Sequence, residues 1–183
     1  MKIVRKVTAF ICLFLLASAL IQVGRHAHLP ADEPASVFST WEGFEVDKCA
    51  AIWLIKRFID EEAVIRFFPK GTLIRDGVAF DTPEAKFRRY HNMSTFESLL
   101  RHCKIKDPKL VFIGEIVHDI EVNLWERKRF DETPIVQEAI TRIIRNSESN
   151  EEIIQESCTY FDRLYEGLET NAIRGNGFEI DSY

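Results

Sequence analysis

The chain has 183 residues, of which 24 are lysine or arginine and 29 are aspartate or glutamate. The length suits one domain with a short additional segment, and the net charge of −5 argues against a nucleic-acid-binding protein. The four cysteines lie far apart and show no Cys-x-x-Cys spacing, which excludes the usual zinc-finger pattern.

The first 27 residues have the pattern of a targeting segment. Lys2, Arg5 and Lys6 precede the uncharged, largely apolar residues 7–24, and this order is typical of a secretory signal. Small residues at 17–19 offer a cleavage site, but the run is also close to the roughly 17–20 apolar residues that span a bilayer. The sequence predicts a signal peptide or an uncleaved anchor in residues 1–27. Either way, we expect an exported, periplasmic or extracytoplasmic protein, and an anchor would hold it at the membrane through residues 7–24.

The rest of the chain divides into a linker, one domain and a tail. Residues 28–40 contain two prolines and lack periodicity, which predicts a linker. Residues 41–170 are expected to form one domain, and residues 171–183 a flexible tail. Without the four cations of the N-terminal segment, 20 cations face 29 anions, a net charge of −9. We interpret Cys49, Cys103 and Cys158 as buried free thiols.

The first predicted element of the domain is a helix over residues 48–60. Its apolar side chains cover most of its circumference, which is typical of a helix buried in a core. Asp47 is expected to be its N-cap. Lys56 and Arg57 lie near its C-terminal end, where cations suit the helix dipole.

Strands are predicted next. Residues 63–68 are rich in β-branched and aromatic side chains, and residues 72–75 and 78–81 flank Asp76-Gly77, the preferred two-residue hairpin turn. Residues 87–90 could add another strand. The prediction is therefore a small antiparallel sheet near residues 63–90.

Four further helices follow. Ser94 and Glu97 have the spacing of a capping box that opens a helix to about residue 103. Asp107-Pro108 opens a second, to about residue 124. A third begins near Pro134, and the last runs over residues 151–168. The predicted fold class is α+β: a mostly helical single domain with one small sheet.

Two histidines, His91 and His118, are the candidate metal ligands. Glu115 and His118 are three residues apart on a predicted helix and therefore share a face, so they could converge on one metal ion, although a solvated helix face explains them equally. His91 precedes the helix that Glu97 caps. Together with Glu97 or Asp119, these residues would make a two-histidine, carboxylate site suited to zinc or iron.

Cations near helix ends suggest an anion site as well. Lys48 and Arg57 are the candidates for a chromate-like oxyanion, with surface charge as the alternative. The sequence has no glycine-rich phosphate loop, nucleophile elbow or catalytic cysteine pattern. We therefore assign no catalytic residue and no organic cofactor.

The run from Asp47 to Asp60 (DKCAAIWLIKRFID) resembles the signature of the chromate-resistance (ChrB-type) family. Further matches follow in the family's order: Phe80-Asp81, His91, residues 95–97, residues 116–120 and residues 162–166. The resemblance covers about residues 41–168. Lys48 and Lys56 stand where the family has arginine, and lysine lacks the planar fork of a guanidinium.

The resemblance implies a domain tied to chromate resistance, in its stand-alone exported form rather than joined to a DNA-binding half. Our leading hypothesis is an exported protein that binds a metal ion or an oxyanion and no nucleic acid. A metal-dependent enzyme, redox or hydrolytic, and a non-catalytic interaction module are the alternatives.

Overall fold

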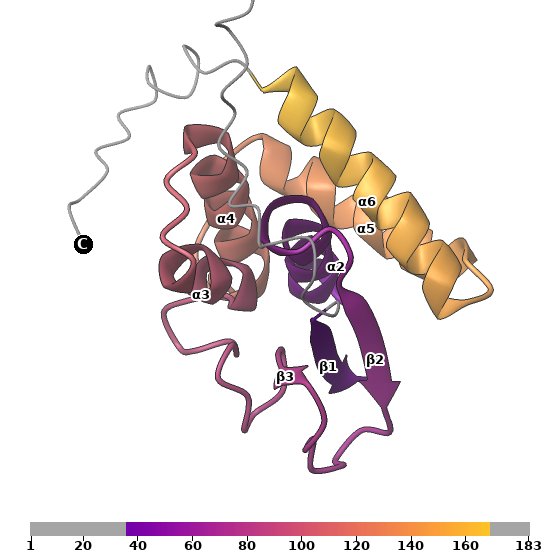
Figure 1. Cartoon of the computed structure of the whole chain (residues 1–183). Coiled ribbons are helices and arrows are strands. Elements are labelled where there is room, and N and C mark those ends of the chain that lie inside the picture. Colours follow the sequence, from indigo (N-terminus) through magenta and orange to yellow (C-terminus); the bar gives the residue numbers. More distant parts are fainter. Residues whose placement is uncertain (1–35, 169–183) are drawn as a thin grey trace, which may run out of the picture. The chain divides into compact units, whose positions relative to one another are not determined.

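The computed structural model describes residues 36–168. In this part of the chain five α-helices and one turn of π-helix accompany a three-stranded sheet (Figure 1). In chain order the elements are β1 (Val37–Trp41), α2 (Val46–Leu54), the π-helix η1 (Ile55–Ile59), β2 (Val64–Phe68), β3 (Val78–Ala79), α3 (Thr95–His102), α4 (Pro108–Glu121), α5 (Glu132–Asn146) and α6 (Asn150–Gly167).

Helix α2 lies at the centre of the domain. All nine of its residues are buried, and it contacts α3 and α4 on one side and α5 and α6 on the other (Figure 1). This confirms the prediction from its apolar circumference. The helix ends in η1, where the Asp60 N–H donates to Ile55 O, one residue further back than in an α-helix.

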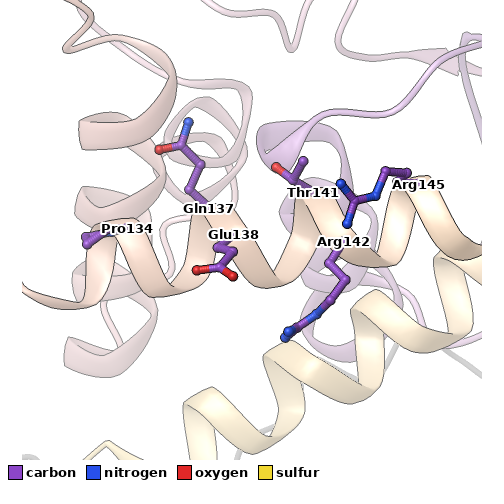
Figure 2. A pocket seen from close by; sticks show the side chains of 6 residues that line it. All are labelled: Pro134, Gln137, Glu138, Thr141, Arg142 and Arg145. Atoms are coloured by element: carbon purple, nitrogen blue, oxygen red, sulfur yellow. The ribbon is translucent and has the colours of Figure 1, made fainter.

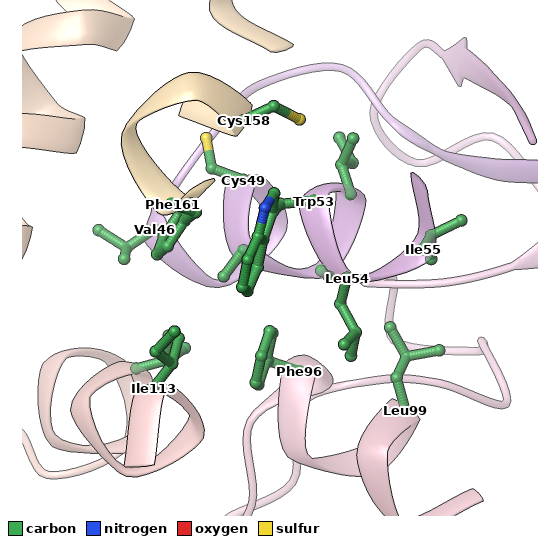
Figure 3. Close-up of a cluster of buried hydrophobic side chains, with 14 of the residues drawn as sticks. Val46, Cys49, Trp53, Leu54, Ile55, Phe96, Leu99, Ile113, Cys158 and Phe161 are labelled. Carbon is green, nitrogen blue, oxygen red and sulfur yellow. The ribbon is translucent and has the colours of Figure 1, made fainter. Parts of the chain in front are cut away.

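Trp53 of α2 is the largest fully buried side chain and joins three helices (Figure 3). Its ring stacks on Phe161 of α6, with centroids 5.4 Å apart, and lies parallel to Phe96 of α3. Its indole N–H donates to Asp162 Oδ1 at 2.7 Å, so the polar atom of the ring is also satisfied. The aromatic core therefore fixes α3 and α6 on opposite sides of α2.

The sheet is parallel, so the predicted antiparallel sheet is wrong. The strand order is β2-β1-β3, and β1 pairs in parallel with both neighbours. The chain leaves β1, passes through α2 and η1, and returns to the same end of the sheet to begin β2, which is the crossover that a parallel pair needs. The run at 87–90 contributes only isolated bridges, at Phe87 and Tyr90.

Asp76-Gly77 is a turn but not a hairpin turn. Residues 72–75 form no strand, and β2 and β3 lie on opposite edges of β1 instead of pairing. Gly77 has φ +72°, and a Cβ at this position would meet Val37 O at 2.4 Å. The glycine is therefore needed for the close passage of the backbone beside β1.

The four later helices confirm their predictions. Ser94 and Glu97 form the expected capping box, and the Asp107 side chain accepts from the Lys109 and Leu110 N–H groups. Gly114 lets α4 approach α3 closely, because a Cβ there would lie 3.3 Å from the Phe96 ring.

The domain boundaries need one change. Strand β1 occupies residues 37–41, so the end of the predicted linker belongs to the sheet. The predicted signal or anchor (1–27), most of the predicted linker (28–35) and the whole of the predicted tail (171–183) lie outside the described residues. No helix within residues 36–168 has the length and apolarity to cross a bilayer. Cys49, Cys103 and Cys158 are free, as predicted, but Cys103 is exposed.

Replacing the central indole tests the role of the core. Trp53→Ala should lower the free energy of unfolding by about 3–5 kcal/mol, because it leaves a cavity beside Phe161 and removes the hydrogen bond to Asp162. Urea denaturation of both forms measures the difference. Trp125→Ala is the matched control, because Trp125 is 96% exposed, and it should change stability by less than about 0.5 kcal/mol. Equal losses in the two variants would contradict this account.

Candidate functional site

A buried carboxylate joins α2 to the start of α3. Asp47 is fully buried, and its two oxygens accept from the N–H groups of Thr95 at 2.7 Å and Phe96 at 2.9 Å. The first N–H groups of a helix have no partner within the helix and carry partial positive charge. Asp47 therefore caps α3 from outside it, and its predicted role as N-cap of its own helix is wrong: Glu45 holds that position, without a side-chain hydrogen bond.

Lys48 and Asp81 form a second buried contact beside the first. The Lys48 ammonium donates to the carbonyls of Trp41 and Gly43, both at 2.7 Å, and lies 3.6 Å from Asp81 Oδ2. Asp81 Oδ1 accepts from the Thr95 hydroxyl at 2.8 Å. Each of these two side chains is only 5% exposed. Lys48 is thus surrounded by partners from its own domain.

Arg89 closes the cluster on its solvent side. Its guanidinium lies 2.9 Å from Glu45, 3.2 Å from Glu121 and 3.4 Å from Asp47. Glu121 also accepts from the Val46 N–H at 3.0 Å, which attaches the end of α4 to the start of α2. We refer to Glu45, Asp47, Lys48, Asp81, Arg89 and Glu121 as the charge cluster.

The charge cluster has four carboxylates and two cations, and burial acts on its titration. Burial raises the pKa of Asp47 to about 6, although the two backbone donors and Arg89 oppose the shift. Burial, and then the charge of Asp47, raise the pKa of Asp81 to about 7. Burial also raises the pKa of Glu121 and lowers that of Lys48. The cluster therefore holds protons at a pH where exposed carboxyl groups have lost them.

Glu97 and His118 form the pair closest to the predicted metal site. His118 Nδ1 lies 2.9 Å from Glu97 Oε2, and the same oxygen accepts from the Ser94 N–H at 2.7 Å. Glu97 therefore caps α3 and contacts His118 at the same time. The hydrogen bond that His118 donates to Glu97 raises the pKa of His118, because it favours the charged imidazolium.

Glu115 lies on the same side of α4 as His118. Burial raises the pKa of its carboxyl group, and the charge of Glu97 adds to this rise, while the charges of Arg129 and His118 oppose it. Its Oε2 is buried and has no hydrogen-bond partner. The structure therefore brings three of the five predicted metal-site residues into one neighbourhood, with an unpartnered oxygen among them.

The other two predicted ligands lie elsewhere. Asp119 is fully buried, and its carboxylate accepts from Asn123, Thr133 and the Arg129 N–H in the connection between α4 and α5. His91 is exposed in a turn and has no hydrogen bond to the other four within residues 36–168. In the same residues no group of three or more His, Cys, Asp or Glu side chains is arranged to hold a metal ion.

Arg57, predicted with Lys48 to bind an anion, also has a partner within the domain. Its guanidinium pairs with Asp162 of α6 at 3.1 Å, and this carboxylate accepts the indole N–H of Trp53 as well. Arg57 and Lys48 therefore do not share a site. Arg57 contacts α6, whereas Lys48 contacts the loop that carries Asp81.

A shallow hollow on α5 is separate from all of these residues. Figure 2 shows the six side chains that line it, which are Pro134, Gln137, Glu138, Thr141, Arg142 and Arg145. All six belong to one helix and all are exposed, so the hollow is open surface and not an enclosed cavity.

Sequence reasoning missed the charge cluster as a unit. Asp47 was interpreted as an N-cap, Lys48 as a candidate anion ligand and Asp81 as the end of a predicted strand. The available signal was Asp47-Lys48 itself: two charged residues at the start of a helix that is apolar on nearly every face must be buried, and buried charges need partners. Which partners they have depends on the tertiary fold.

Asp81→Asn tests the electrostatics of the charge cluster. Between pH 4 and 7 the folded protein holds a proton on Asp81 that the unfolded chain has lost, so folding stability should fall as the pH rises through this range. The variant lacks that titration, and asparagine tolerates the φ of +51° found here. Relative to the variant, the wild type should lose about 1.4 kcal/mol for each unit of pKa difference between its folded and unfolded states.

Urea denaturation at several pH values gives this comparison. Glu84→Gln, an exposed carboxylate in the same loop, is the control and should leave the pH dependence unchanged. Parallel stability curves for wild type and Asp81→Asn would show that Asp81 does not titrate as described.

Comparison with known proteins identifies the family. The family model described as ChrB, C-terminal domain, matches residues 38–168, which is most of the chain and all of the fold described above except its first two residues. Comparisons with curated proteins and with solved structures gave no match. The match confirms the resemblance seen in the sequence, and the chain belongs to the ChrB C-terminal domain family, which is associated with chromate resistance.

Proposed function

We propose that this chain is an exported chromate-resistance protein whose domain binds a divalent transition-metal ion through His118 and Glu115. The observation that carries the proposal is the 2.9 Å contact between His118 Nδ1 and Glu97 Oε2 beside the unpartnered oxygen of Glu115.

The Glu97–His118 contact determines which nitrogen is free. An ionised carboxylate only accepts hydrogen bonds, so Nδ1 carries the proton and Nε2 keeps its lone pair when the ring is neutral. Histidines that bind metals usually donate their other N–H to a carboxylate or carbonyl, which fixes the ring and makes it more basic. In this proposal Glu97 is an orienting residue and not itself a ligand.

Glu115 supplies the negative charge that a cation needs. Its Oε2 is buried without a donor, and an unpartnered buried carboxylate oxygen is costly. A cation beside Nε2 of His118 would remove this cost, since Glu115 lies one turn earlier on the same helix face. Imidazole and carboxylate ligands suit zinc or iron, with water completing the coordination.

The second candidate is a metal-dependent hydrolytic or redox enzyme. It is favoured by the same pair, because a histidine held by a carboxylate through Nδ1 presents Nε2 as a general base or as a ligand of a metal with open positions. Turnover that disappears when the metal is removed would distinguish it from a binding protein.

Export is part of the proposal and rests on residues 1–27. The three cations followed by the apolar residues 7–24 support it. A reporter fused after residue 168 that is active only outside the cytoplasm would test it.

Metal titration tests the binding site. Purified protein titrated with Zn²⁺ should bind one ion, and His118→Ala and Glu115→Gln should each weaken binding by at least tenfold, because each removes a proposed ligand. Glu97→Gln should weaken it by about 10–100-fold, as expected for an orienting carboxylate. Affinity should also fall as the pH drops through the pKa of His118, which Glu97 holds above its usual 6.5.

His102→Ala is the matched control, since His102 is an exposed histidine in the last turn of α3 and lies outside the proposed site. Circular dichroism should establish that every variant is folded. Absence of stoichiometric Zn²⁺ or Fe²⁺ binding by the wild type, or equal losses in His102→Ala and His118→Ala, would refute the proposal.

A further inference from the structure

The connection between α4 and α5, residues 122–131, presents two large apolar side chains to solvent. Trp125 is 96% exposed and Leu124 is 65% exposed. Single exposed apolar residues are common, but a tryptophan almost wholly in water beside an exposed leucine is not, because burying large apolar side chains is favourable. We call this connection the Trp125 loop.

Hydrogen bonds from Asn123 and Lys128 hold the tip of the Trp125 loop in place. The Asn123 side chain donates to Asp119 Oδ1 at 2.7 Å and accepts from the Glu126 N–H at 3.1 Å, which closes a turn around Leu124 and Trp125. The Lys128 ammonium donates to the carbonyls of Asp119 and Asn123.

The far side of the loop is fixed as well. The Arg129 N–H donates to Asp119 Oδ2 at 2.7 Å, and Phe130 packs edge-on against Phe112 of the core. The exposed tip is therefore a structured projection whose two ends are tied to one buried carboxylate. Its apolar side chains cannot reach the core without breaking these bonds.

The charges around the tip indicate the partner. Arg127, Lys128 and Arg129 lie within four residues of Trp125, and the acidic residues of the loop are Glu126 and Asp131, so the loop carries a net charge of +1. This local excess of positive charge is notable in a domain whose net charge is negative. A tryptophan and a leucine next to clustered cations are the composition of segments that lie in the interface of anionic membranes.

We propose that the Trp125 loop inserts Leu124 and Trp125 into the interface of an anionic bilayer. The indole suits this layer because its ring is apolar and its N–H can stay in contact with water and headgroups. The flanking guanidinium groups would attract lipid phosphates. The proposal concerns residues distinct from His118 and Glu115, and it can fail or hold independently of the metal site.

The N-terminal segment supports a membrane as the occupant. If residues 7–24 remain in a bilayer, residues 25–36 can extend at most about 40 Å, so the domain would stay close to the membrane surface. Two side chains give only weak binding by themselves. A tether raises the effective concentration of the loop at the surface, which makes a weak contact sufficient. A second copy of the chain is a less suitable occupant, because two such loops carry charge of the same sign.

Fluorescence quenching tests the proposal on the full chain. The protein is mixed with vesicles of phosphatidylglycerol and phosphatidylcholine that contain lipids brominated near the headgroup, and with matched vesicles of phosphatidylcholine alone. Trp53 is buried and Trp41 is half-buried, so the difference between wild type and Trp125→Phe isolates the signal of Trp125. We expect Trp125 to shift to the blue and to be quenched on the anionic vesicles.

Two variants and one control identify the cause of the quenching. Arg127→Glu should reduce partitioning on the order of tenfold, because each cation near an anionic surface contributes about a factor of five. Arg145→Glu, on the exposed side of α5, is the matched charge reversal and should have little effect. Leu124→Ser should weaken quenching without changing the circular dichroism spectrum.

Several results would overturn the proposal. Trp125 could stay unquenched while the chain is bound to the vesicles, which would mean that only the N-terminal segment enters the membrane. Equal quenching on neutral vesicles would remove the role of the cations. A blue shift that depends on protein concentration without lipid would indicate that a second copy covers the tip.

Discussion

The carboxylate of Asp47 is the interaction on which the rest of the domain depends. It lies in the first turn of the central helix, fully buried, and accepts the Thr95 and Phe96 N–H groups at the start of α3. A carboxylate without partners would be prohibitively costly at this depth, and so would a buried helix terminus whose donors are unpaired. The carboxylate and the helix terminus each remove the cost of burying the other. Their hydrogen bonds therefore position α3 against α2 independently of the apolar contacts between the two helices.

The start of α3 then organises both sides of the site. Thr95 gives its N–H to Asp47 and its hydroxyl to Asp81, which lies beside Lys48. Two residues later Glu97 caps the helix through the Ser94 N–H and contacts His118 with the same oxygen. One turn of helix therefore connects the charge cluster to the Glu97–His118 pair.

Local chemistry made much of this structure predictable. The capping residues Ser94 and Asp107 predicted the starts of α3 and α4, and the apolar circumference of residues 48–60 predicted a buried helix. Both signals are local, because caps and hydrophobic periodicity depend on residues a few positions apart. Strand pairing was mispredicted because it depends on partners far along the chain: Asp76-Gly77 has the composition of a hairpin turn, yet Gly77 serves the passage of the backbone beside Val37. The role of Asp47 was missed for the same reason, since its partners are almost fifty residues away.

Helix α4 is where the two proposed activities meet. His118 and Glu115 face α3, while the next residue, Asp119, is buried and ties down the Trp125 loop. Arg129, whose N–H binds Asp119, also lowers the pKa values of Glu115 and His118 through its charge. If the loop entered a membrane surface, anionic headgroups would compete for this guanidinium and reduce its effect on both groups. His118 would then hold its proton more firmly, so a membrane-bound domain should need a higher pH than a free one to bind the same metal ion.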